Sequence, residues 1–183
     1  MSLPQIMSPT YGTASDNQLI QLYMNNIKPG TREDRVDHVW TQILRFYWPI
    51  TANYGIEREP YAAEHVGTKT DVVLTTSSAK RIVKCLFVEC KGHKATILPS
   101  DWKDSIDQLE RYIRRWEERE LSQAIYGLIC IGDSVRFFYM PHFKDKLVDF
   151  KAGKLLFSIK NDSTEVDLIL REIRELITIE HLV

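Results

Sequence analysis

The stretch from Gly67 to Gly92 constrains the fold of this chain more than any other. It contains two apolar segments rich in β-branched residues, at positions 70–76 and 82–91, separated by a short polar segment. Such residues favour strands, and a short polar break between two of them is typical of the turn of a β-hairpin. The sequence therefore predicts two paired strands here.

Three charged side chains interrupt these apolar strands: Asp71 on the first, and Glu89 and Lys91 on the second. Side chains alternate between the two faces of a strand, so Glu89 and Lys91 share a face, and pairing would bring Asp71 to the same end of the sheet. One interpretation is a cross-strand salt bridge, which stabilises little when it is exposed. The apolar neighbours favour burial, and an unpaired buried charge is costly, so we favour a functional site.

Helices and further strands are predicted on both sides of the hairpin. Apolar residues at helical spacing predict a helix over 31–48 and another over 101–120 that Ser100 would cap. Shorter patterns predict strands at 56–61, 124–131, 135–139 and 155–159, and a loop over 62–69. The order is α-β-β-β-α-β, which predicts an α/β fold with a mixed central sheet flanked by helices.

The length of 183 residues fits one domain. Within it we expect a loose, flexible arm over 1–14, a core over 31–139 and a C-terminal helix over 162–181.

The net charge is −1, so no global basic field would attract nucleic acid. The N-terminus lacks the pattern of a signal peptide and no apolar run reaches membrane-spanning length, so we expect no membrane partner. An odd count of three cysteines favours a reducing, intracellular compartment, cytoplasmic or nuclear. Cys85 and Cys90 lie five residues apart on one predicted strand, so alternation places them on opposite faces, which argues against a zinc site shared with His93.

Hydrolysis of a phosphodiester bond needs a divalent cation held by hard oxygen ligands, a water molecule made nucleophilic and a cation facing the developing charge. Asp71 and Glu89 supply carboxylates, and the backbone carbonyl of Cys90 would be a third ligand. Lys91 would orient the attacking water and stabilise the charge at phosphorus. Mg²⁺ or Mn²⁺ would suit such a site.

With these residues the chain resembles the PD-(D/E)XK, or restriction-endonuclease-like, nuclease superfamily. Asp71 matches the motif aspartate, and Glu89-Cys90-Lys91 matches the ExK. Gln108 and Tyr112 resemble the Q-h-x-x-Y signature of RecB-type nucleases, on the helix that follows the ExK strand. The spread of these elements is similar to the N-terminal nuclease domain of type I restriction R subunits. Thr70 departs from the pattern, because it stands where the superfamily has proline.

The resemblance implies roles for residues outside the hairpin. An acid on the first helix would act through water or a second metal, and Glu33 matches it best, with Asp37 as the alternative. Gln108 would position Lys91 or the nucleophile. Substrate contacts would come from Tyr112, Arg111 and His93. For Arg111 a solvated helix face that pairs with glutamates is the simpler interpretation.

We therefore expect a Mg²⁺- or Mn²⁺-dependent nuclease, a phosphodiester hydrolase acting on DNA, with RNA not excluded. The alternative is a catalytically inactive module of the same restriction-endonuclease-like αβββαβ fold that binds nucleic acid or protein. A homodimer formed through the last helix is a third hypothesis.

Overall fold

A mixed β-sheet forms the centre of the computed structural model, which describes residues 10–12, 17–58, 61–63, 66–78, 81–116 and 123–181. Its seven strands within these ranges run in the order β1-β4-β5-β6-β7-β8, and β9 also pairs with β7. They are β1 (Tyr54–Arg58), β4 (Val72–Ser78), β5 (Arg81–Lys91), β6 (Ile125–Ile131), β7 (Ser134–Met140), β8 (Val148–Asp149) and β9 (Phe157–Ser158). The predicted α/β class with a mixed sheet is confirmed.

The pairing of β5 with β6 is parallel, whereas all other strand pairs described in this sheet are antiparallel. Parallel neighbours need a crossover connection, and helix α3 (Pro99–Arg115) supplies it. The other helices are α1 (Gln18–Asn25), α2 (Glu33–Tyr47), the short 3₁₀ helix η2 (Ile50–Ala52) and α4 (Ser163–His181). In chain order, α2-β1-β4-β5-α3-β6 follows the predicted α-β-β-β-α-β.

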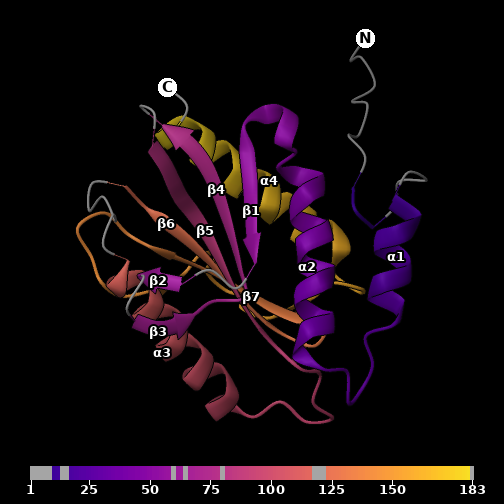
Figure 1. The fold of residues 1–183 in the computed structure, drawn as a ribbon. Helices are drawn as coiled ribbons and strands as arrows, with labels where there is room; N and C mark the ends of the chain where they lie inside the picture. Colours follow the sequence, from indigo (N-terminus) through magenta and orange to yellow (C-terminus); the bar gives the residue numbers. More distant parts are fainter. Residues whose placement is uncertain are drawn as a thin grey trace.

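Helices cover both faces of the sheet (Figure 1). On one face, apolar residues of α1, α2 and α4 form a buried cluster with alternate strand residues, including Trp40, Leu44, Val88 and Leu170. On the other face α3 buries its apolar stripe against the strand residues that point the other way, such as Phe87. Period-two alternation along the strands thus supplies both cores.

Helix α3 begins one residue before the predicted cap Ser100. Its N-cap residue is Leu98, whose main-chain N–H donates to the Asp101 carboxylate at 2.9 Å. An acid in the first turn both accepts an unpaired N–H and faces the positive end of the helix dipole. The end of the predicted helix, residues 117–120, lies outside the described residues.

A β-bulge in β5 changes the predicted faces of two cysteines. Leu86 pairs with Leu74 but Lys84 pairs with Thr75, so Cys85 is an extra residue on its strand. Cys85 and Cys90 consequently both belong to the core on the α2 side, and the prediction of opposite faces is wrong. Both thiols are fully buried, and they serve as small apolar side chains.

The segment 62–69, predicted as a loop, contains a separate two-stranded antiparallel sheet, β2 (Tyr61–Ala63) with β3 (Val66–Lys69). The predicted arm over 1–14 is described only at residues 10–12. There Tyr11 is fully buried and its hydroxyl donates to the carbonyl of Ile159 at 3.0 Å. Among the described residues, no helix is both long and apolar enough to span a membrane.

Candidate active site

The register of the hairpin places Asp71 across from Glu89. Val72 pairs with Val88 and Val73 with Phe87, so the residue before Val72 lies opposite the residue after Val88. Asp71 itself precedes β4, which begins two residues later than the predicted strand. The two acids therefore meet where the ladder between β4 and β5 ends.

Short polar contacts join the predicted residues into one cluster. The main-chain N–H of Cys90 donates to Asp71 Oδ2 at 2.5 Å, and Lys91 Nζ donates to Glu89 Oε1 at 2.5 Å. Lys91 Nζ also lies 3.7 Å from Glu33 Oε2, although Glu33 is 58 residues earlier in the chain. We call these four side chains, Glu33, Asp71, Glu89 and Lys91, the acid cluster.

Both hairpin acids hold their protons more tightly than usual. Burial, opposed by the Cys90 N–H and reinforced by Glu33, raises the pKa of Asp71 to about 6. Burial and the charge of Asp71 raise the pKa of Glu89 to about 7, against the pull of Lys91. Burial lowers the pKa of Lys91, but the surrounding acids outweigh it and the net change is upward. Burial is thus the largest cause of the raised pKa of both hairpin acids, and the neighbouring acids add to it.

The Cys90 carbonyl faces the same side of β5 as its N–H. In a strand, both backbone groups of one residue point toward the same neighbouring strand, and the N–H of Cys90 points to Asp71. The carbonyl of the next residue, Lys91, points the other way and accepts from the N–H of Gly132 at 3.0 Å. The Asp71 carboxylate and the Cys90 carbonyl therefore lie on the same side of the strand end.

The close approach of two backbones brings Glu33 to the hairpin. The His93 N–H donates to the carbonyl of Thr31 at 2.8 Å, and the Gly30 N–H donates to the carbonyl of His93 at 3.0 Å. Between them, a Cβ on Gly92 would lie 2.8 Å from the Thr31 oxygen. Glycine is therefore needed here, because it lets the start of α2 lie against the exit of β5.

Asp37, the alternative first-helix acid, has a different partner. It is buried, and its carboxylate oxygens lie 2.6 and 2.8 Å from Nη2 of Arg58 on β1. A carboxylate in such an ion pair is already compensated. Of the two acids, Glu33 is the one in contact with Lys91.

The predicted residues of α3 differ in burial and in their neighbours. Tyr112 is 1% exposed and its ring packs on Phe87, with centroids 5.4 Å apart. Burial, with the charge of Glu57, raises its pKa far above the usual value. Gln108 is half-buried and Arg111 is exposed, and neither has a hydrogen bond to the acid cluster in the described parts of the chain.

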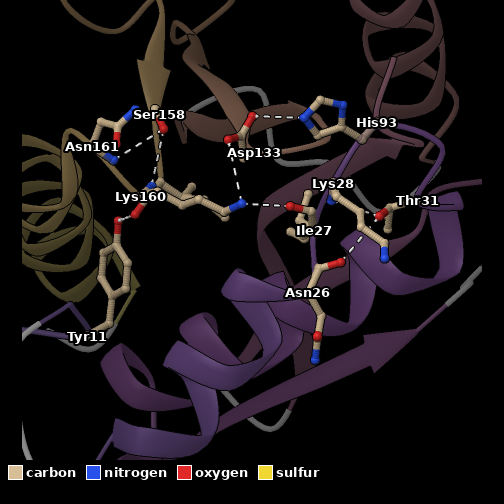
Figure 2. A network of polar contacts seen from close by, with 11 residues as sticks. Tyr11, Asn26, Ile27, Lys28, Thr31, His93, Asp133, Ser158, Lys160 and Asn161 are labelled. Atoms are coloured by element: carbon tan, nitrogen blue, oxygen red, sulfur yellow. Dashed lines mark hydrogen bonds and ion pairs between the residues drawn. The ribbon is translucent and has the colours of Figure 1, made fainter. Parts of the chain in front are cut away.

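His93 belongs to a neighbouring polar network (Figure 2). Its Nε2 lies 3.5 Å from Asp133, in the turn between β6 and β7, and Asp133 lies 4.0 Å from Lys160 Nζ. Lys160 in turn donates to the carbonyl of Ile27 at 2.6 Å, as Figure 2 also shows. This network connects the exit of β5 to the segment between α1 and α2.

Sequence reasoning missed several of these partners. Arg58, Asp133 and Lys160 gave no sequence signal of their own, because their roles depend on segments that meet only in the folded chain. Gly92 did carry a signal, since a glycine directly after a charged strand end often marks a close backbone approach.

Within the described residues, no group of three or more histidine, cysteine, aspartate or glutamate side chains is arranged to hold a metal ion. Compared with models of known protein families, with curated proteins and with solved structures, the chain has no match.

Proposed function

We propose that this protein is a metal-dependent nuclease that hydrolyses phosphodiester bonds in DNA. The observation that carries the proposal is the pair of opposed acids, Asp71 and Glu89, whose pKa values are both raised and which share one lysine. Buried like charges in a polar cluster are typical of functional sites. The order α2-β1-β4-β5-α3-β6 also follows the αβββαβ order of the superfamily that the motifs resemble.

The residues fit a divalent cation. One oxygen of each hairpin acid is engaged, Asp71 Oδ2 by a main-chain N–H and Glu89 Oε1 by Lys91, and within the described residues the other oxygen has no hydrogen bond. These two oxygens and the Cys90 carbonyl would hold Mg²⁺ or Mn²⁺, which takes one or two carboxylates together with waters and phosphate oxygens. What the cation would supply is stabilisation of phosphate charge and a lower pKa for water.

Among the residues of the chain itself, Lys91 has the central role in the proposed reaction. Its ammonium group lies between Glu89 and Glu33, so it places a fixed positive charge beside these acids. There it orients the attacking water and stabilises the charge that develops on the phosphate oxygens. Glu33 positions Lys91 from the opposite side, and Arg111 is available for contact with the DNA backbone. The burial of Tyr112 favours packing over phosphate contact.

The proposal is tested by a cleavage assay on circular, linear and single-stranded DNA, and on RNA, with Mg²⁺ or Mn²⁺. Lys91→Ala should slow cleavage by at least about 10²-fold, because it removes a cation that acts in the transition state. Lys84→Ala is the matched control, since Lys84 is a half-buried lysine of the same strand about 20 Å away. Circular dichroism checks that both variants are folded.

Cleavage by Lys91→Ala at the wild-type rate would refute the assignment. If the wild-type protein binds DNA but cuts none of these substrates with either metal, the inactive binding module becomes the better description of the protein.

A further inference from the structure

A cavity of about 370 Å³ lies between α1 and α2, outside the acid cluster. Its size falls within the range of small-molecule sites, about 300 to 1,000 Å³. The side chains that distinguish it are Tyr23 from α1 and Arg35 and His38 from α2, together with the N-cap residue Arg32. It thus combines aromatic rings with positive charge.

The charge of this cavity has one sign. Two arginines line it, and no acidic side chain among the described residues does. Arg32 is partly compensated by Asp34, 3.3 Å away, but that pair is exposed and therefore weak. Arg35 is exposed and forms no ion pair within the described residues. The whole chain has a net charge of −1, so the two arginines of the cavity are a local excess of positive charge.

The aromatic wall is formed by Tyr23 and His38. Their rings meet edge to face with centroids 4.6 Å apart, and both are half-buried. A ring held in this way offers a flat, rigid surface on which a nucleic-acid base can stack.

The wall formed by the segment between α1 and α2 is fixed by hydrogen bonds. The hydroxyl of Thr31 accepts from the Lys28 N–H at 2.9 Å and donates to the carbonyl of Asn26 at 3.4 Å. Lys160 Nζ donates to the carbonyl of Ile27 (Figure 2). Three of these residues, Asn26, Ile27 and Thr31, line the cavity, so its shape is largely set before any ligand binds.

The cavity adjoins the acid cluster through consecutive residues of one segment. Arg32 lines the cavity, and the next residue, Glu33, contacts Lys91. Adjacent Cα atoms are about 3.8 Å apart. The carbonyl of Thr31, a residue that also lines the cavity, accepts from the N–H of His93 just after β5. The cavity lining and the acid cluster are therefore joined by adjacent residues of the segment 31–33.

We propose that this cavity holds one nucleotide of the substrate strand beside the bond that is cut, with its phosphate on Arg35 and Arg32 and its base against Tyr23 and His38. That the bound strand is a substrate rests on the proposed nuclease function. Nucleotide binding is measured without cleavage, so the binding proposal and the nuclease proposal can each be refuted separately.

The experiment measures binding of fluorescent single-stranded and duplex oligonucleotides by anisotropy, in EDTA and over a series of salt concentrations. Arg35→Ala should weaken binding about tenfold and reduce the slope of log affinity against log salt by about one, as the loss of one phosphate contact does. Arg35→Lys should recover most of the affinity. Arg45→Ala is the matched control, because Arg45 is an exposed arginine of the same helix about 15 Å along its axis.

In the cleavage assay, Arg35→Ala should raise KM and leave kcat unchanged, as expected for a contact made equally in the ground and transition states. Equal binding by Arg35→Ala and Arg45→Ala would refute the inference while leaving the nuclease proposal intact. Binding that depends on Arg35 in a protein that never cleaves would refute the nuclease proposal instead. If adenosine monophosphate binds with the same dependence on Arg35 but oligonucleotides do not, the cavity is a site for a free nucleotide and the inference is wrong.

Discussion

Glu89 and Asp167 are both buried acids beside a cation, and they differ in how their oxygens are used. Asp167 on α4 accepts from the Tyr47 hydroxyl with one oxygen and from Arg171 Nε, at 2.8 Å, with the other. Glu89 is bonded to Lys91 through one oxygen alone in the described residues. Both oxygens of Asp167 accept hydrogen bonds from the protein, so this acid is saturated. Glu89 keeps one oxygen without a hydrogen bond from the described residues.

Glu110 on α3 follows the pattern of Asp167. One of its oxygens accepts from Lys146 Nζ and the other from the Leu147 N–H, both at 3.0 Å. Saturated acids of this kind connect elements that are distant in the chain, here α3 with the segment after β7. Burial alone therefore does not mark a functional acid. An incompletely bonded oxygen next to a second acid does so better.

The largest effect that separates the two kinds of acid should be on cleavage. Glu89→Gln keeps an acceptor for Lys91 but removes a negative charge, so we expect cleavage to fall about 10³-fold and uptake of Mn²⁺ to be lost. Single-turnover cleavage and calorimetric titration with Mn²⁺ measure the two effects. Glu172→Gln, in the surface pair with Lys151, is the control that should change neither. Full activity of Glu89→Gln would remove Glu89 from the site.

The next largest effect should be on stability, at the saturated acid. Asp167→Ala leaves Arg171 and the Tyr47 hydroxyl without their buried partner, so the free energy of unfolding should fall by about 3 kcal/mol. Urea denaturation measures it, with Leu168→Ala at the exposed neighbouring position as control. Cleavage per folded molecule should be unchanged. A loss of less than about 1 kcal/mol would mean that the network contributes little.

The hairpin of the candidate site could be predicted because its signals are local. β-branched runs identify strands, and the period of two placed Glu89 and Lys91 on one face, which the contact between them confirms. Convergence with Asp71 followed once the strands were taken as antiparallel neighbours, and the register bears it out. The order of helices and strands was predictable for the same reason.

Features that depend on tertiary packing could not be read from the sequence. The bulge at Cys85 adds one residue to β5, so the residues of β5 before it point to the opposite faces from those predicted. No residue type at this position indicates a bulge. The pairing of Asp37 with Arg58 depends on how α2 lies against β1. A choice between Glu33 and Asp37 therefore needed the folded chain.

Gly92 tests how far the site depends on the packing of α2 against β5. In Gly92→Ala the new Cβ would lie 2.8 Å from the Thr31 carbonyl and 3.4 Å from the Glu33 nitrogen, so the start of α2 must shift. We expect a loss of about 2 kcal/mol in unfolding free energy and a loss of about tenfold in cleavage.

Gly55→Ala is the control for this change, because its Cβ would meet the hydroxyl of Thr75 on the neighbouring strand β4. Stability should fall there too, with cleavage per folded molecule unchanged. Equal effects of the two substitutions on cleavage would contradict a specific role of Gly92 in placing Glu33.

The smallest effect is a difference in stability that depends on pH. The pKa of Asp71 is raised from 3.8 to about 6 in the folded state, so below pH 4 the folded and unfolded proteins both carry its proton. As the pH rises from about 4 to 6, the unfolded state ionises Asp71 while the folded state still holds its proton, so stability is lost over this interval. Asp71→Asn keeps an acceptor for the Cys90 N–H and avoids this cost. The variant should be more stable than wild type by about 1 kcal/mol at pH 8, and equally stable at pH 4.

Urea denaturation at the two pH values, in EDTA, measures this difference. Asp37→Asn is the contrasting variant, because Asp37 is paired with Arg58 and its removal should destabilise the protein at pH 8. A gain for Asp71→Asn beside a loss for Asp37→Asn would show that the fold tolerates one acid for its chemistry and needs the other for its structure. If Asp71→Asn is instead less stable than wild type at pH 8, Asp71 is a structural acid like Asp167, and the acid cluster loses its distinguishing feature.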